Sequence, residues 1–307
     1  MSPSSTNTVA VFVGPSYDDE LAAAVRDAGG TVADSADAAH AFVMTGGPDD
    51  LKDMDHDGLA WVQLGSAGIE GWFAAGALRS GVTYTSAAGA YGPGCAEHCL
   101  ALMLALARRL DEHAAGTSWN RLEGTSLFGA RVTIVGAGGI GQDLMRLMSP
   151  FGVTVDAVNH SGRAVSGAER TVRSAQLLEV IGDADYVVDC APDTPDTKGL
   201  IGADALAAMK KSAYLVNVGR GPTIATDALV EALSSGSITG AGLDVTEPEP
   251  LPDRHPLWST PRTVITSHTA NPGSLNKAAL VERVRDNVGR RVRGEDLLGL
   301  VDLDHQY

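Results

Sequence analysis

Several residue types are scarce in this sequence of 307 residues, and each scarcity excludes a class of protein. Lysine and arginine number 23 against 38 aspartates and glutamates, which leaves a formal net charge of −15. Binding to a phosphate backbone requires clustered positive charge, so we expect no nucleic-acid partner. The three cysteines, Cys95, Cys99 and Cys190, lack the spacing with histidine that a metal site requires. We interpret them as small buried side chains and expect no metal.

Long hydrophobic runs are missing as well. The longest, from Cys99 to Ala107, is too short to cross a bilayer, and residues 1–8 lack the positive charge that begins a signal peptide. We therefore expect no membrane partner and a cytoplasmic location. With 44% hydrophobic residues the composition is that of a globular protein, and the length allows one large domain or two modest ones.

Short β-type runs alternate with helical stretches along the chain, which is typical of mostly parallel sheets. The sequence predicts strands at 8–13, 41–44, 61–64, 131–135, 153–158, 186–190, 214–218, 240–245 and 263–267. It predicts helices at 18–28, 94–113, 140–148, 174–181, 202–210, 226–234 and 275–293. The helix at 94–113 is so apolar that it must be buried. Thr226 and Asp227 suit the start of their helix because they can satisfy free N–H groups and oppose the helix dipole.

The strand at 131–135 runs into a glycine cluster, Gly136-Ala-Gly138-Gly139-Ile140-Gly141, which opens a helix. A strand, a glycine turn and a helix in this order are the context that a dinucleotide-binding turn requires. Gly136 permits the tight turn, Gly138 lets the backbone approach a pyrophosphate, and Gly141 lets the helix pack on the strand. The sequence therefore predicts a dinucleotide site at the N-terminus of this helix.

The end of the next strand indicates which dinucleotide binds. An NAD site usually has an aspartate or glutamate there for the ribose 2′-hydroxyl, but this chain has Asn159. Asp156 lies in mid-strand, where it should point into a sheet face. His160, Ser161 and Arg163 follow Asn159, and hydrogen-bond donors with positive charge suit a 2′-phosphate. We therefore favour NADP over NAD, and a solvent-facing loop that happens to hold one arginine is the alternative.

Three segments in the second half of the chain carry catalytic residue types. They contain Asn217-Val-Gly-Arg220, Asp244-Val-Thr-Glu-Pro-Glu249 and His268-Thr-Ala-Asn271. Each begins at the carboxyl end of an expected strand, where open α/β sheets bind ligands. Together they supply a guanidinium, a carboxylate and an imidazole, which are the groups that reduction of a 2-keto acid requires.

In order and spacing these segments resemble the D-isomer-specific 2-hydroxyacid dehydrogenase family, with its Arg–Glu–His set. The segment from Cys190 to Thr197 is similar to the family's cofactor-side loop, and Ser66-Ala-Gly-Ile-Glu70 is similar to its turn for the substrate carboxylate. The resemblance covers nearly the whole chain. It implies an enzyme, an NAD(P)H-dependent oxidoreductase that reduces 2-keto acids to D-2-hydroxy acids.

The resemblance also assigns roles to residues. His268 would be the general acid, Glu249 would raise the pKa of His268 through its negative charge, and Arg220 would orient the substrate. The substrate-binding residues implied are Ser66, Ala67, Gly68 and Arg220. The cofactor-binding residues, including those of the glycine turn, are Gly136, Gly138, Gly139, Ile140, Gly141, Asn159, His160, Ser161, Arg163, Ala191, Pro192, Thr197, Val218, Gly219, Asp244 and His268. Asp244 would meet the nicotinamide carboxamide.

The fold implied is α/β, with two Rossmann-like domains and an interdomain cleft. A flavodoxin-like substrate domain would comprise residues 1–94 and 285–307, and a dinucleotide-binding domain residues 95–284. The resemblance further implies a homodimer and a small 2-keto acid substrate whose side chain stays open. A dinucleotide-sensing regulator with the same fold is the alternative function, since some relatives of the family act as cofactor-sensing corepressors.

Overall fold

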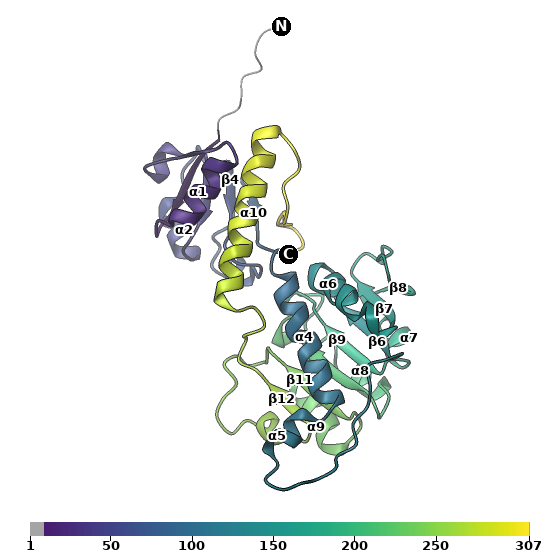
Figure 1. Ribbon diagram of the computed structural model, residues 1–307. Coiled ribbons are helices and arrows are strands. Elements are labelled where there is room, and N and C mark those ends of the chain that lie inside the picture. The colour runs from purple at the N-terminus through teal and green to yellow at the C-terminus, as the bar shows by residue number, and fades with distance from the viewer. Residues whose placement is uncertain (1–8, 307) are drawn as a thin grey trace. The chain divides into compact units, whose positions relative to one another are not determined.

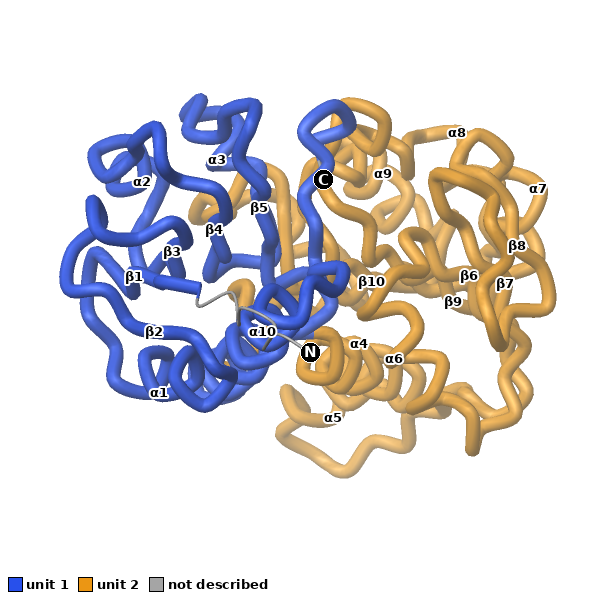
Figure 2. Tube along the Cα trace, turned by 90° about the horizontal axis from the view of Figure 1, so that it is seen from above, with its two compact units in different colours: residues 1–91, 273–307 blue, residues 92–272 orange. Residues whose placement is uncertain are grey.

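The computed structural model describes residues 9–306, shown in Figure 1. The chain divides into two compact units, residues 1–91 with 273–307 and residues 92–272, which Figure 2 colours separately. Each unit contains a parallel sheet with helices, which confirms the α/β fold class. Thr8, where the first strand was expected to begin, lies outside the described residues.

The first unit is built on a five-stranded parallel sheet in the order β2-β1-β3-β4-β5. This is the flavodoxin-like strand order. The strands are β1 (Ala10–Gly14), β2 (Thr31–Val32), β3 (Ala41–Met44), β4 (Trp61–Gln63) and β5 (Thr83–Thr85). The helices are α1 (Asp19–Asp27), α2 (Pro48–Met54), α3 (Glu70–Ala74) and α10 (Gly273–Arg293). The sequence did not predict β2 and β5, which are two and three residues long.

Helix α10 completes the first unit, although it is distant from the rest of that unit in the sequence. It packs against α1, and its Val284 and Val288 are buried in one core with Val11, Val13 and Trp61 of the sheet. The helix begins at Gly273 and is continuous, so the division falls at 272/273 and not at 284/285 as expected from the sequence. The other division falls at 91/92, three residues before the expected one at 94/95.

The second unit is built on a seven-stranded parallel sheet in the order β12-β11-β10-β9-β6-β7-β8. Its strands are β6 (Arg131–Val135), β7 (Thr154–Asn159), β8 (Arg170–Arg173), β9 (Tyr186–Asp189), β10 (Tyr214–Asn217), β11 (Gly240–Leu243) and β12 (Thr263–Ile265). Its helices are α4 (Gly92–Ala107), α5 (Leu110–Ala115), α6 (Gly139–Met148), α7 (Leu178–Ile181), α8 (Ala203–Ala208) and α9 (Thr226–Ser235). The polar edge strand β8 was not predicted, because its RTVR sequence has one apolar residue.

Helices cover both faces of this sheet, so successive residues of each strand enter different cores. On one face α4 and α6 lie side by side, and their buried residues pack with Ile134 and Val188 (Figure 1). On the other face α7, α8 and α9 pack with Val135 and Val187. Strands buried on both faces read as continuous apolar runs, which is why β6 and β9 were clear in the sequence.

The apolar helix expected at 94–113 is not one helix. Helix α4 ends at Ala107, Arg109 adopts a left-handed conformation with φ of 53°, and α5 follows. A later segment of the chain comes back to the end of α4 and stops it there, because the N–H group of Thr125 donates to the carbonyl oxygen of Ala107 at 2.7 Å. The Arg109 guanidinium then holds Glu112 in the first turn of α5. A contact between residues distant in the sequence therefore overrides a good helical pattern.

The helix expected at 226–234 does begin at Thr226, with Asp227 in its first turn where it opposes the helix dipole, but the expected satisfaction of free N–H groups by these side chains is wrong. The N-cap residue of α9 is Ala225, and no side chain caps this helix. The Thr226 hydroxyl instead donates to the carbonyl oxygen of Glu247 at 2.7 Å. It thereby ties the start of α9 to the segment that carries Glu249.

No helix among residues 9–306 is long and apolar enough to cross a membrane. All three cysteines are free thiols; Cys99 is fully buried, whereas Cys95 and Cys190 are half-buried. The expectation of small buried side chains is therefore met in full by Cys99 and in part by the other two.

Candidate active site

The strands of the seven-stranded sheet all run in one direction, so their carboxyl ends lie along one edge of the second unit. Along this edge the strand order places His268 after β12, Asp244 after β11 and Arg220 after β10. The loop after β9, the glycine turn after β6 and Asn159 at the end of β7 follow in that order. The order of strands reverses between β6 and β9, and such a switch point is where open α/β sheets bind ligands.

Two glycines make the turn after β6 possible. Gly136 has φ of 80°, and a Cβ atom there would lie 2.5 Å from the amide nitrogen of Ala191. Gly141 lies one turn into α6, and a Cβ atom on it would lie 2.9 Å from Cγ2 of Ile134. Only glycine therefore lets this turn approach β9 and lets α6 pack on β6.

The start of α6 fits a pyrophosphate. Gly138 is the N-cap residue, no side chain caps the helix, and a Cβ atom on Gly138 would meet nothing within 4 Å. The N–H groups of the first turn, which include those of Gly139 and Ile140, have no acceptor within the helix. An open approach and free N–H groups at the positive end of a helix are what an anion requires.

The side chain of Asn159 shapes the turn that follows β7. Its Oδ1 accepts a hydrogen bond from the N–H group of Gly162 at 2.6 Å, and its Nδ2 donates to the carbonyl oxygen of Arg163 at 2.9 Å. Ser161 Oγ accepts from the N–H group of Arg163 at 3.2 Å. His160, Ser161 and Arg163 are exposed on this turn. Asn159 thus acts through loop shape, and the loop presents a guanidinium and a hydroxyl.

Sequence reasoning missed Arg173, which lies beside this turn. It is the last residue of β8 and pairs with Asn159 in the parallel register. A Cβ atom on Gly162 would lie 2.8 Å from Cγ of Arg173, so the arginine side chain runs along the turn. Within residues 9–306 its guanidinium forms no ion pair or hydrogen bond. The signal would have been an arginine at the carboxyl end of a strand, but β8 itself was not predicted.

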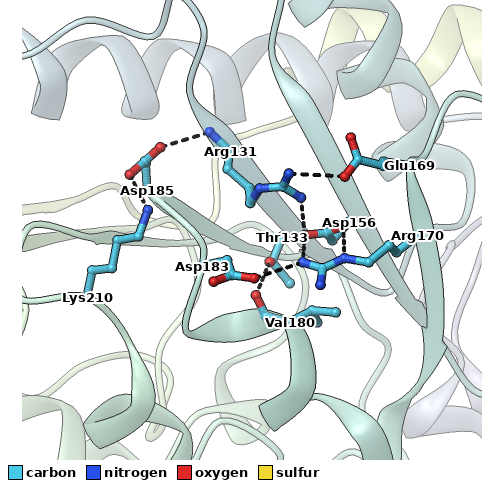
Figure 3. A network of polar contacts seen from close by, with 9 residues as sticks. All are labelled: Arg131, Thr133, Asp156, Glu169, Arg170, Val180, Asp183, Asp185 and Lys210. Atoms are coloured by element: carbon cyan, nitrogen blue, oxygen red, sulfur yellow. Dashed lines mark hydrogen bonds and ion pairs between the residues drawn. The ribbon is translucent and has the colours of Figure 1, made fainter.

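Asp156 points into the sheet, as the sequence led us to expect. It is fully buried and accepts hydrogen bonds from Arg131 at 2.9 Å and from Arg170 at 2.6 and 2.7 Å (Figure 3). Burial alone would raise its pKa, but the hydrogen bonds of Arg170 and Arg131 outweigh burial and hold the pKa below its usual value. Asp156 is therefore occupied by structural ion pairs.

The loops after β9 and β10 contact each other. A Cβ atom on Gly219 would lie 2.6 Å from the carbonyl oxygen of Ala191, so these backbones meet closely. Ala191 and Val218 are buried, and Pro192 is exposed. The Thr197 hydroxyl donates to the carbonyl oxygen of Pro192 at 2.6 Å and closes the β9 loop on itself.

The structure brings His268 and Glu249 together. Nδ1 of His268 lies 2.6 Å from Oε1 of Glu249. Since a carboxylate accepts, the hydrogen of this bond is on Nδ1, and Nε2 is left to face a ligand. Both side chains are about half exposed, at 51% and 40%. This is the geometry of a general acid oriented by a carboxylate.

Asp244 holds the segment that carries His268. His268 has an unusual φ of 51°, and its N–H group donates to the carbonyl oxygen of Asp244 at 2.8 Å. The buried carboxylate of Asp244 accepts from the N–H groups of Thr269 and Ala270 at 2.9 and 3.0 Å and from the Thr266 hydroxyl at 2.6 Å. Asp244 therefore positions the loop of His268, a role that sequence reasoning did not assign to it.

Arg220 lies in a loop that is fixed by its neighbours. Asn217 accepts from the N–H group of Gly219 at 2.9 Å and donates to the carbonyl oxygen of Arg220 at 3.0 Å. Burial raises the pKa of Cys95 to about 11; Asp244 adds to that rise and Arg220 opposes it, which places all three side chains near one another. Arg220 therefore lies in the same neighbourhood as the loop of His268.

A pocket of about 250 Å³ lies at this end of the sheet, within the second unit. Asp244, Glu249 and His268 line it together with the apolar Leu251 and Trp258. Two larger pockets, of about 380 and 620 Å³, lie elsewhere. The first is lined by His40 and Glu295, but His40 Nδ1 pairs with the carbonyl oxygen of Gly58, and the second has no carboxylate among the described residues that line it. The pocket at His268 is the smallest of these three. We assign it as the candidate active site because of its lining groups and not because of its volume.

The turn at Ser66, Ala67 and Gly68 belongs to the first unit. Ser66 Oγ donates to the carbonyl oxygen of Gly68 at 2.6 Å and accepts from Nε1 of Trp72 at 3.1 Å. Within residues 9–306 the N–H groups of Ala67 and Gly68 donate to no acceptor. Their role toward a substrate stays a prediction.

A Rossmann-type sheet with this acid and carboxylate at its ligand edge defines a dinucleotide-dependent oxidoreductase. Comparison with known proteins gives the family: residues 100–270 match the NAD binding domain of D-isomer specific 2-hydroxyacid dehydrogenases. A Corynebacterium melassecola protein, described as uncharacterized and encoded in the proB 3′ region, is 39% identical over 94% of this chain and 97% of its own. The chain belongs to the D-isomer specific 2-hydroxyacid dehydrogenase family.

Named relatives and solved structures agree. Human glyoxylate reductase/hydroxypyruvate reductase is 34% identical over 66% of this chain and 64% of its own length. The NADPH-dependent glyoxylate/hydroxypyruvate reductase of Sinorhizobium meliloti, solved with NADP and sulfate, is 27% identical, with a TM-score of 0.80 over 98% of this chain and 100% of that one. A Xanthobacter autotrophicus family member with NADPH and MES has a TM-score of 0.81 at 25% identity, over 98% of this chain and 99% of that one. The chain is thus an NAD(P)-dependent 2-hydroxyacid oxidoreductase with two Rossmann-like units.

Proposed function

We propose that this protein is an NADPH-dependent reductase that converts small 2-keto acids, of the size of glyoxylate and hydroxypyruvate, to D-2-hydroxy acids. The observation that carries the proposal is the 2.6 Å contact between His268 Nδ1 and Glu249 at the wall of the pocket. Relatives named glyoxylate/hydroxypyruvate reductase support the substrate size. The pocket volume of about 250 Å³ suits a ligand of this kind.

The residues divide the work of the reduction. The reduced nicotinamide supplies hydride to the carbonyl carbon when it is bound. His268 gives the proton on Nε2 to the carbonyl oxygen, and Glu249 keeps the ring oriented and balances its charge. Arg220 binds the substrate carboxylate and stabilises negative charge that develops on the carbonyl oxygen. Asp244 holds the backbone on which His268 is placed.

The preference for NADPH rests on the turn after β7. Asn159 uses its side chain within the turn, so no carboxylate is offered to a ribose 2′-hydroxyl. Arg163 and Ser161 are exposed on the turn, and Arg173 runs along it from β8. In a chain of net charge −15, two arginines at this one turn suit a 2′-phosphate. The Sinorhizobium meliloti and Xanthobacter autotrophicus proteins bound to NADP and NADPH support the same preference.

The proposal also includes a homodimer and a separate role for each of the two units. The second unit would bind the dinucleotide and the first would contribute the turn at Ser66 to Gly68. In the second unit the side chains of Trp119 and Phe128 are fully and two-thirds exposed, and exposed aromatic side chains are typical of interfaces. A second copy of the chain is the partner that we propose for them, and light scattering with Trp119→Ser tests it.

The direct test is oxidation of NADPH and NADH, measured in parallel with a panel of 2-keto acids. We expect turnover of the smallest acids with NADPH and its loss in His268→Ala. Faster turnover with NADH would overturn the cofactor preference alone. Tight binding of NADPH without turnover of any acid would contradict the reductase and would support the dinucleotide-sensing regulator.

A further inference from the structure

Asp189 is a buried acid for which the reduction has no direct use. It ends β9, directly before the cofactor-side loop, and its side chain is fully buried. Oδ1 accepts a hydrogen bond from the N–H group of Ala191 at 3.0 Å, and Oδ2 contacts the hydroxyl of Thr223. No arginine, lysine or histidine pairs with it among residues 9–306.

The Thr223 hydroxyl lies between two oxygen atoms. On one side is Oδ2 of Asp189, and on the other is the carbonyl oxygen of Arg220, 2.5 Å from Oγ1. A hydroxyl has one hydrogen and can donate it to one of them only. The carbonyl oxygen of Arg220 has no hydrogen to give in return. If Asp189 were a carboxylate, one of these two short contacts would join two oxygen atoms with no hydrogen between them.

We propose that Asp189 is a neutral carboxylic acid and a positioning residue for Arg220. Its Oδ2–H group donates to Thr223 Oγ1, and the Thr223 hydroxyl donates to the carbonyl oxygen of Arg220. Oδ1 stays an acceptor for Ala191, so both carboxyl oxygen atoms of Asp189, the Thr223 hydroxyl and the Arg220 carbonyl each have a partner. Ionisation of Asp189 reverses the Thr223 hydroxyl, and the Arg220 carbonyl oxygen then keeps only the N–H donors of Asn217 and Thr223.

The surroundings favour the neutral acid. Burial raises the pKa of Asp189 to about 7, and its hydrogen-bond contacts with Thr223 and Ala191 offset that rise only in part. The titratable groups nearby are thiols: Cys190 follows Asp189 in the chain, and Cys99 and Cys95 of α4 act on Cys190. Burial raises the pKa of Cys190 well above its usual range, so it stays uncharged. Among residues 9–306, no cation contributes to the pKa of Asp189.

Thr223 is held well enough to transmit this contact. Its carbonyl oxygen accepts from the N–H group of Ile201 at 3.0 Å, and the neighbouring Ile224 forms a β-bridge with Ile201. The backbone of Thr223 is therefore held in place by Ile201, and a change at Asp189 reaches Arg220 through the Thr223 hydroxyl. The series Asp189–Thr223–Arg220 thus links one proton to the shortest of the three hydrogen bonds that hold the carbonyl oxygen of Arg220, the residue proposed to bind the substrate.

The first test is infrared spectroscopy of the holoenzyme. At pH 6 ordinary carboxyl groups are ionised, so we expect one carboxylic acid C=O band in wild type that is absent in Asp189→Asn and that disappears as pH rises through about 7. Asp185→Asn is the matched control, because Asp185 precedes the same strand and has a lowered pKa. No band, or a band unchanged in Asp189→Asn, overturns the neutral acid.

The second test measures KM for the keto acid from pH 6 to 8.5, and it rests on the proposed function. The ratio of wild-type KM to Asp189→Asn KM removes every pH dependence that both proteins share. We expect a ratio near one at pH 6 and a rise of up to about thirtyfold at pH 8.5, because only the fraction with neutral Asp189 binds well. The asparagine N–H group donates at every pH.

Variants of Thr223 separate positioning from packing. Thr223→Ser keeps the hydroxyl and should retain the pH dependence of KM, whereas Thr223→Val should raise KM at all pH values without that dependence. A flat ratio of KM overturns the positioning role even if the infrared band is present. If no acid is turned over, the proposed function fails, and the infrared band still decides whether Asp189 is neutral.

Discussion

Acidic side chains have different kinds of partner at the two ends of the strands in the seven-stranded sheet. At the amino end Asp185 pairs with Lys210 at 2.8 Å and accepts from the N–H group of Arg131, close to the ion pairs of Asp156 (Figure 3). At the carboxyl end of the same strand, four residues on, Asp189 meets a hydroxyl and an amide. Burial acts to raise the pKa of both acids, but at Asp185 the hydrogen bonds from the Arg131 N–H group and from Lys210 outweigh burial and lower the pKa. The partner, and not burial itself, sets the protonation state.

Strands β7 and β8 repeat the contrast. Asp156 and Arg170 are joined near the amino end, whereas Asn159 and Arg173 lie at the carboxyl end and are not joined to each other by any hydrogen bond. Residues of similar type thus form ion pairs at one edge, whereas at the other edge the proposed function assigns them to the cofactor. Substitutions at matched positions can separate the two edges.

The largest effect should come from His268 at the carboxyl edge. We expect His268→Ala to lower kcat/KM about a thousandfold, because general acid catalysis is removed. Its melting temperature should stay close to that of wild type, since the ring is half exposed. Keto acid assays with thermal denaturation check both statements. A large loss of stability without a loss of activity would contradict the idea that His268 at the carboxyl edge serves activity and not stability.

Asp189 should make the protein less stable as pH rises. Its folded pKa of about 7 lies above the unfolded value of 3.8, so the unfolded state releases this proton first, and the free energy of unfolding falls between about pH 4 and pH 7. The full difference corresponds to about 4 kcal/mol as an upper bound. Denaturation of wild type and Asp189→Asn across this range measures it. Asp185 and Asp156 act in the other sense, since their stabilisation is lost as pH falls below about 4.

Asp156→Asn should weaken the amino edge without affecting chemistry. The change leaves Arg131 and Arg170 with a poorer buried partner, and we expect a loss of about 2 kcal/mol in the free energy of unfolding. This figure allows for screening of the two arginines, whose side chains are partly exposed. KM for the keto acid at saturating NADPH should not change. A shift of KM comparable with that of an Arg220 variant would contradict the separation.

The smallest effect is expected of Arg173, with Arg170 of the same strand as its control. Arg173→Gln should weaken binding of 2′,5′-ADP about tenfold, the loss of one charge-assisted contact, and should leave binding of AMP unchanged. Arg170→Gln should lower stability and leave both affinities unchanged. Isothermal titration calorimetry measures them. Equal losses for 2′,5′-ADP and AMP would show that Arg173 does not select the 2′-phosphate.

Periodicity and short motifs predicted those structural features that are determined by residues close together in the sequence. The β6 strand and the glycine turn were located because apolar runs and glycines carry local information, whereas His268 and Glu249 were identified through the resemblance to the dehydrogenase family. The break of α4 at Arg109 depends on Thr125 returning to Ala107, which no local pattern encodes. Arg173 and Asp189 were missed for a similar reason: the first needed the register of an unpredicted edge strand, and the second needed the count of hydrogens around Thr223.

The position of α10 has a consequence for synthesis on the ribosome. The core of the first unit needs Val284 and Val288, but residues 92–272 are made between its two pieces. At ordinary translation rates that intervening stretch takes about 10 to 40 s, during which β1, β3 and α1 lack a covering helix. The second unit, which is continuous in the chain, can therefore fold first, although it is the later to begin. Chaperones that shield apolar surface should engage the nascent chain chiefly through its first ninety residues.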